Sequence, residues 1–250
     1  MEEMTKLPSE LVQFIPWNSS SHPLWLGTSL TFRRNINPFL FPQKLGKTES
    51  KELISLLKKN LGNHPLLKDS FFIPLEELES TERQFLFETF FNLAPQGALT
   101  PSSALVVDKT CHRMITLNLQ DHLVIHVNDF EGQWEENFTN LMALDDSLSE
   151  SLSFAFNDPF GYLTSSLEHC GTGFEARFYL HLPALLRQQG GEKFQKTELP
   201  ESISCTDLQN ASDGFLGDVV MVISATRAVR LVGRNHSLEH SALTQLLGRE

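Results

Sequence analysis

The stretch FGYLTSSLEHCGTGFEARFYLHLPAL runs from Phe160 to Leu185 and joins two apolar runs through a glycine turn. The apolar runs favour strands at Gly161 to Thr164 and at Phe178 to Leu182. Gly171-Thr172-Gly173 lies between them, and taken alone such a triplet is typical of a turn. The functional meaning of this stretch therefore depends on the motifs that surround it.

Strands and helices alternate along the rest of the chain. Turn residues at Asp108-Lys109 and Gln120-Asp121 separate three apolar runs and predict antiparallel hairpins. The predicted strands are Leu24–Phe32, Phe71–Leu75, Ala104–Val107, Arg113–Leu119, Leu123–Val127 and Asp218–Ala225, besides the two above. The predicted helices are Ser9–Phe14, Thr48–Leu61 (capped by Thr48 or Ser50), Ser80–Phe91, Phe130–Phe156 and Ser237–Leu247, and Gly190–Ser212 is polar and irregular. Together they predict an α+β fold with a large, mostly antiparallel sheet flanked by helices.

Composition excludes several classes of function. The 250 residues suffice for one large domain or two small ones. A formal net charge of −11 argues against a general binder of nucleic acid or of acidic membranes. Cys111, Cys170 and Cys205 form no CxxC pattern, so we expect neither a disulfide framework nor a metal site. With no apolar leader or membrane-spanning run in the sequence, we expect a cytoplasmic protein.

Four motifs give the glycine turn its context. They are LGTSLTFRRNINPFLFP from Leu26 to Pro42, NLQDHLVI from Asn118 to Ile125, the stretch from Phe160 to Leu185, and Leu216-Gly217-Asp218. In this order they resemble the bacterial protein-arginine kinases, which are ATP:guanidino phosphotransferases. The resemblance covers roughly Leu24 to Leu247. It implies an eight-stranded antiparallel sheet flanked by helices, with an N-terminal helix and connector at 1–23 and a guanidino-kinase-like catalytic domain at 24–250.

The resemblance also implies a nucleotide site. In the family, ATP and Mg²⁺ bind over the sheet, arginines hold the phosphates, and a glutamate positions the guanidinium or takes its proton. Arginine suits this task because its planar fork of donors is always charged. The residues that match the family pattern as nucleotide-binding candidates are Arg34, His122, Gly171, Thr172 and Gly173. Without the resemblance, His122 would be interpreted as a surface or half-buried histidine at a hairpin turn.

The sequence departs from the family pattern where the pattern requires charge. Ser29, Thr31, Val124 and Glu175 stand at positions of phosphate-binding arginines, and Gln120 stands at the position of the catalytic glutamate. The segment that lines the guanidino site in the family is here Ser166 to His169. A carboxamide cannot accept a proton at neutral pH, and each lost charge-stabilising donor costs roughly 3–4 kcal/mol of transition-state stabilisation. These departures predict a catalytically degenerate homologue with a regulatory or scaffolding role.

An active enzyme is the alternative. In that case a rearranged phosphate clamp would have to draw on Arg33, Arg34, Lys109 or Arg177. Arg177 follows Glu175 by two residues, so on a strand both point to one face and could pair with each other. The spatial arrangement of these cations separates the two hypotheses.

The partners follow from the resemblance alone. Active relatives work with a small zinc-binding activator and with a Clp-type protease system, and we expect a protein partner of this kind. Asp145-Asp146 in the longest predicted helix either caps or decorates that helix or, as the less favoured alternative, binds a metal ion.

Overall fold

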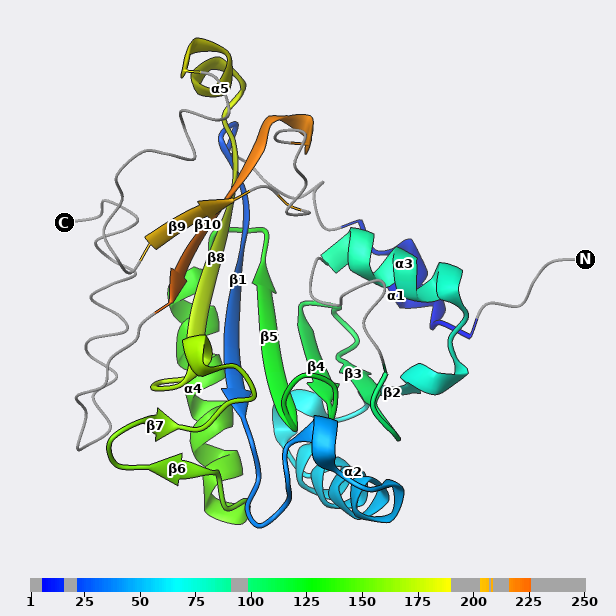
Figure 1. Cartoon of the computed structure of the whole chain (residues 1–250). Coiled ribbons are helices and arrows are strands. Elements are labelled where there is room, and N and C mark those ends of the chain that lie inside the picture. Colours follow the sequence, from blue (N-terminus) through cyan, green and yellow to red (C-terminus); the bar gives the residue numbers. More distant parts are fainter. Residues whose placement is uncertain are drawn as a thin grey trace, which may run out of the picture.

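An antiparallel sheet forms the centre of the fold in a computed structural model that describes residues 6–15, 22–90, 99–189, 203–206, 208 and 216–225 (Figure 1). Its strands are β1 (Trp25–Arg34), β2 (Phe71–Pro74), β3 (Ala104–Val107), β4 (Arg113–Leu117), β5 (Leu123–Asp129), β8 (Phe174–His181), β9 (Ile203–Thr206) and β10 (Val219–Ala225). These eight strands pair in the order β2-β3-β4-β5-β1-β8-β10-β9, and every pairing is antiparallel. The predicted fold class is confirmed.

Alternation along β1 separates two kinds of side chain. Leu30 and Phe32 point to one face, where they join the main hydrophobic core. Ser29, Thr31 and Arg33 must point to the other face, because successive side chains of a strand alternate. Both sets are buried, so the centre of the sheet is covered on both sides.

Helices cover both faces. On the main core face lie α2 (Lys47–Gly62) and α4 (Trp134–Ser151) (Figure 1). Their apolar side chains share one hydrophobic core with those of β1, β5 and β8. There Phe138 packs edge-on against Phe174, with ring centroids 5.4 Å apart. On the opposite face α1 (Ser9–Gln13) and α3 (Ser80–Phe90) lie near β2, β3 and β4, where Leu11 and Leu86 share a second core with Leu105. The shorter helices are α5 (Pro183–Gln189) and single 3-10 turns at Pro42–Lys44, Pro65–Leu67, Leu75–Glu77, Leu167–His169 and Leu216–Asp218.

The longest helix is shorter than its predicted range of Phe130–Phe156. The Asp129 carboxylate accepts backbone N–H groups from Glu131 and Gly132, each at 3.0 Å, and Gly132 has a φ of 82°. This turn delays the start of α4 to Trp134. The helix ends at Ser151 because Leu152 is already extended.

Other predicted boundaries shift as well. The cap predicted at Thr48 or Ser50 was wrong, because α2 begins at Lys47 and its N-cap is Gly46, whose N–H donates to Glu49 Oε2 at 3.2 Å. The strand predicted at Phe178–Leu182 starts at Phe174. A strand, β9, lies in the segment predicted as irregular. The strand predicted at Gly161–Thr164 is shorter in the structure, where it is β7 (Gly161–Tyr162). It pairs with β6 (Phe156–Asn157) in a hairpin separate from the main sheet. The predicted helix Ser237–Leu247 and most of the connector before His22 lie outside the described residues.

Candidate functional site

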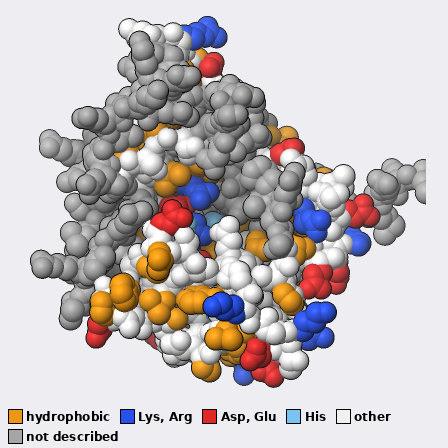
Figure 2. All heavy atoms as spheres, in the orientation of Figure 1, with side chains coloured by type: hydrophobic (Ala, Val, Ile, Leu, Met, Phe, Trp, Pro, Cys, Tyr) orange, Lys and Arg blue, Asp and Glu red, His pale blue; other side chains and the backbone are white. Residues whose placement is uncertain are grey.

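Three neighbouring strands present polar side chains on the face of the sheet opposite α4. In β-sheet register Thr31 lies opposite both His126 and Glu175, Ser29 lies opposite Arg177, and Arg33 lies opposite Val124. Directly opposite residues share a face of the sheet. We call this surface the polar face: Ser29, Thr31, Arg33, Val124, His126, Glu175 and Arg177. It brings together the four positions where the sequence departs from the family's arginines, and Figure 2 shows basic, acidic and histidine side chains gathered near the middle of the molecule.

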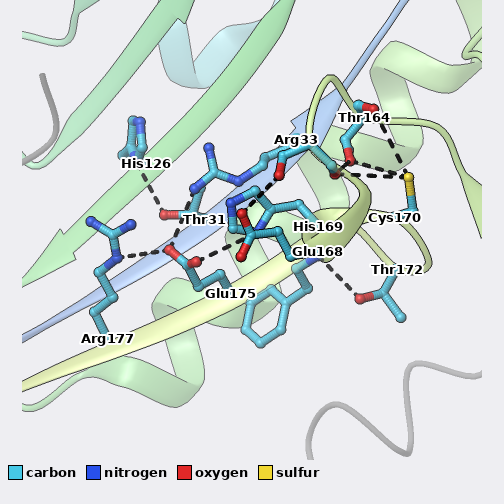
Figure 3. Close-up of polar contacts among 12 residues, drawn as sticks. Thr31, Arg33, His126, Thr164, Glu168, His169, Cys170, Thr172, Glu175 and Arg177 are labelled. Atoms are coloured by element: carbon cyan, nitrogen blue, oxygen red, sulfur yellow. Dashed lines mark hydrogen bonds and ion pairs between the residues drawn. The ribbon is translucent and has the colours of Figure 1, made fainter. Parts of the chain in front are cut away.

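Glu175 is the centre of the polar face (Figure 3). Its Oε1 accepts a hydrogen bond from Arg177 Nε at 2.7 Å and a longer one from Arg33 Nη2 at 3.4 Å. Its Oε2 lies 3.8 Å from His169 Nδ1, on the 3-10 turn before β8. Strand β8 therefore supplies both the anion and one of its cations, β1 supplies the second cation, and the pairing of Arg177 with Glu175 expected from their spacing is confirmed.

Burial makes these charges interdependent. The Glu175 side chain is 5% exposed, as is that of Arg33, while Arg177 is 21% exposed. Burial alone would raise the pKa of Glu175, but the positive charges of Arg177 and Arg33 hold that pKa below its usual value. Burial lowers the pKa of Arg33, and Glu175 opposes this shift. The carboxylate and the guanidinium groups thus stabilise one another's charged forms.

A histidine that the sequence analysis did not single out adjoins this cluster. His126 shares a hydrogen bond with Thr31, with Nδ1 and Oγ1 3.0 Å apart. It is 4% exposed. Burial, aided by repulsion from Arg33 and Arg177, holds the pKa of His126 well below the ordinary value of 6.5. Its position could have been inferred from strand alternation, because it follows Val124 by two residues.

The neutral state of His126 predicts a pH-dependent stability. Between its lowered pKa in the folded protein and 6.5, the unfolded chain binds the extra proton, so folding stability must rise with pH. The contribution of this one group reaches at most about 1.4 kcal/mol per pH unit. We expect denaturant unfolding at pH 5, 6 and 7 to show increasing stability, with a smaller increase for His126→Gln. Equal slopes for the two proteins would contradict the assignment.

Arg34 lies on the other face of the sheet from Arg33, and it is buried. Its Nη2 donates to Asp145 Oδ2 on α4 at 2.7 Å, and its Nη1 donates to the carbonyl oxygens of Thr172 at 2.8 Å and of Arg33 at 2.9 Å. The guanidinium also stacks on Tyr162, 3.7 Å from the ring centroid. The structure thus gives Arg34 a packing role between α4 and the glycine turn. Asp145, interpreted from the sequence as a residue that caps or decorates the helix, is instead the buried counter-ion of Arg34.

His122 is likewise buried, and both of its ring nitrogens are bonded. Nδ1 accepts the Ile36 N–H at 2.9 Å and Nε2 donates to the Leu40 carbonyl at 2.8 Å. This corrects the interpretation of His122 as a surface or half-buried residue. Beside it, Asn35 Nδ2 donates to Asp121 Oδ1 at 2.6 Å. Asn35, Asp121 and His122 therefore join the end of β1 to the β4–β5 turn.

The glycine turn packs against the end of β1. The Gly173 carbonyl accepts the Arg33 N–H at 2.9 Å. A Cβ on Gly173 would lie 2.6 Å from the Arg33 carbonyl oxygen, and the φ of Gly173 is 66°. Gly171 exchanges backbone hydrogen bonds with Tyr162, which ties the turn to the β6–β7 hairpin. Thr172 contributes its carbonyl to Arg34, and its hydroxyl accepts the Phe174 N–H at 3.1 Å.

Gln120 and Lys109 lie in turns. Gln120 is exposed in the β4–β5 turn, where its carbonyl oxygen accepts hydrogen bonds from Gln43 Nε2 at 3.1 Å and from Ser165 Oγ at 2.6 Å. Lys109 is exposed in the β3–β4 turn. Of the four cations considered for a substitute clamp, Arg33 and Arg177 lie on the polar face, whereas Arg34 and Lys109 do not.

Neither a metal-binding cluster nor a membrane-spanning helix occurs in the described ranges. No group of three acidic, histidine or cysteine side chains there could hold a metal ion. No helix in the same part of the chain combines the length and apolar character needed to cross a membrane.

The fold is found in known structures. The substrate-free duplicated taurocyamine kinase from Schistosoma mansoni matches with a TM-score of 0.68 at 19% identity, over 87% of this chain and 32% of that one. Lombricine kinase matches with a TM-score of 0.65 at 14% identity, over 98% of this chain and 73% of that one. The chain therefore has the fold of these two kinases.

Sequence similarity identifies the family. Residues 52–228 match the ATP:guanido phosphotransferase C-terminal catalytic domain. Protein-arginine kinase of Chlamydia pneumoniae is 29% identical over 219 residues, 86% of this chain and 61% of that protein. The protein-arginine kinase of Chlamydia muridarum is 31% identical over 196 residues, 77% of this chain and 54% of that protein. The chain belongs to the ATP:guanido phosphotransferase family, as its motifs indicated, and it spans little more than half the length of these relatives.

Proposed function

We propose that this chain is a protein-arginine-kinase-like domain that has lost phosphoryl transfer and acts as a regulator or scaffold. The observation that supports this is the ion cluster on the polar face. Both cations placed there, Arg33 and Arg177, are bound to the carboxylate of Glu175. Phosphoryl transfer depends on free, preorganised positive charge around the phosphates.

Phosphoryl transfer to a guanidinium also requires a base. A guanidinium stays protonated at neutral pH because its pKa is very high. A carboxylate beside it is therefore needed to orient it and to accept its proton. Gln120 is exposed in its turn and supplies a neutral amide at the position of the family's glutamate. The loss of several charge-stabilising donors, each worth roughly 10²–10³ in rate, would remove most of the rate enhancement.

Arginine phosphorylation is the direct test. The purified chain, incubated with Mg²⁺, ATP and an arginine-rich protein, is expected to produce no phosphoarginine above the level without enzyme, as measured by mass spectrometry. An active protein-arginine kinase in the same assay serves as the control. Calorimetry with Mg²⁺-ATP up to millimolar concentration is expected to show no binding by the chain. Phosphoarginine formation, or micromolar ATP affinity, would overturn the proposal.

One observation supports the alternative of an active phosphotransferase with a rearranged clamp. Arg33 and Arg177 bring two positive charges to a single carboxylate, so the three groups together retain a charge of +1. If ATP binds, Arg177→Gln should weaken binding at least tenfold, whereas Arg113→Gln, away from the polar face, should not. Binding of ATP and Mg²⁺ by this chain is part of this alternative.

A catalytically inactive domain would carry out its role by binding a protein partner. The candidates implied by resemblance to active relatives are a small zinc-binding activator and a Clp-type protease system. Binding of either by the purified chain in the absence of nucleotide is the expected result, measured by calorimetry with the purified partner. A requirement for ATP in that binding would favour the alternative.

A further inference from the structure

The Glu175 carboxylate is surrounded as a bound oxyanion would be. Two guanidinium groups from different strands donate to the same oxygen, Arg177 at 2.7 Å and Arg33 at 3.4 Å, and His169 lies 3.8 Å from the other oxygen. Arginine donors of this kind bind carboxylate and phosphate oxygens alike. The coordination therefore selects a small oxyanion, and the chain supplies that oxyanion itself.

The surrounding groups require an anion at this point. The Arg33 side chain is 5% exposed, and Arg177 adds a second positive charge close by. A buried charge left without a counter-ion is strongly unfavourable. Two further polar atoms of the polar face, Ser29 Oγ and Arg33 Nε, are buried and have no hydrogen-bond partner among the described residues. The polar face thus has donor capacity that Glu175 does not use.

We propose that Glu175 fills, from within the chain, an oxyanion site formed by Arg33 and Arg177, so that this face is closed to phosphate by the protein's own carboxylate. The inference rests on the proposed function, in which the domain acts as a regulator or scaffold without binding nucleotide. Neither arginine stands at a position where the resemblance places a phosphate-binding arginine. The site is therefore a feature of this chain's own residues.

Removal of Glu175 should turn the occupied site into a vacant one that free anions can enter. We expect Glu175→Ala to lower the melting temperature. Sodium formate or inorganic phosphate should raise the melting temperature of this variant by roughly 3–6 °C at ten times the dissociation constant. Sodium chloride at equal ionic strength should not do so, and the unaltered protein should gain much less from either anion. If Glu175→Ala does not fold in chloride, its yield on refolding in formate and in chloride provides the same comparison.

Two variants control the assignment. Glu175→Ala combined with Arg177→Ala removes a cation together with the carboxylate and should lose the response to formate and phosphate. Glu52→Ala removes an exposed glutamate from α2, away from the polar face, and should neither change the melting temperature nor create an anion response. Rescue by chloride as large as by formate, rescue retained in the double variant, or no rescue at all would overturn the proposal. These measurements involve no phosphoryl transfer, so their failure and that of the proposed function can be told apart.

Discussion

Replacing Asp145 with alanine should lower the free energy of unfolding by about 3–5 kcal/mol, as found when one partner of a buried ion pair is removed. The Asp145 and Arg34 side chains are 7% and 2% exposed, and their charged atoms are 2.7 Å apart. Without Asp145, the Arg34 guanidinium keeps only carbonyl acceptors and its stacking on Tyr162. Urea unfolding monitored by circular dichroism would measure the loss.

The neighbouring surface of α4 provides the control. Glu150 is an exposed acid on the same helix, and Glu150→Ala should change stability by no more than about 0.5 kcal/mol. The paired change Asp145→Leu with Arg34→Met should lose less than Asp145→Ala alone, because it leaves no buried charge without a partner. Similar effects of Asp145→Ala and Glu150→Ala would show that the ion pair contributes little.

Gly173→Ala is expected to destabilise the protein by about 2–5 kcal/mol. The new Cβ would lie 2.6 Å from the Arg33 carbonyl oxygen and 2.6 Å from Arg34 Nη1, so backbone and a buried side chain would both have to move. Such overpacking typically costs about 1–3 kcal/mol. The φ of 66° adds about 1–2 kcal/mol for a residue that carries a Cβ.

Gly132→Ala separates these two contributions. Gly132 has a φ of 82°, yet a Cβ there would meet nothing within 4 Å. Its substitution should therefore show only the backbone contribution of about 1–2 kcal/mol. Thermal and urea unfolding of the two variants side by side measure the difference. If Gly173→Ala loses no more than Gly132→Ala, the contact between the glycine turn and β1 is looser than the structure indicates.

These two predictions concern the surroundings of Arg34 and Gly173, which match the family pattern, and in the structure both residues support the packing of the fold. Arg34 joins α4 to the glycine turn, His122 holds the segment after β1, and Gly173 lets that turn pack against Arg33. The four departures at the positions of the family's arginines lie instead on the polar face. The chain thus combines the framework of the family with a different set of charges at the centre of the sheet.

The predicted elements succeeded where local pattern is sufficient. Runs such as Leu123–Val127 and Ala104–Val107 alternate or stay apolar between turn residues, and both are strands of the sheet. The predicted ends of elements were wrong where a single side chain stabilises a turn, as the Asp129 carboxylate does just before α4. The start of β8 at Phe174 could not be inferred from hydrophobicity, because the charged residues Glu175 and Arg177 interrupt the apolar run. Both are nevertheless in the strand, where they pair with β1 and β10.

The sequence by itself determined the α+β fold, the family and the positions at which the family's charges are missing, because alternation and ordered motifs are properties of the chain read in order. Only the tertiary structure decided which charges meet. Arg33 and Glu175 are 142 residues apart in sequence, and Arg34 and Asp145 are 111 apart. Their pairing depends on the register of β1 against β8 and on the packing of α4 behind the sheet. Arg33 and Arg34 are adjacent in one strand, so their side chains point to opposite faces of the sheet. Arg33 pairs with Glu175 on the polar face, and Arg34 pairs with Asp145 in the core.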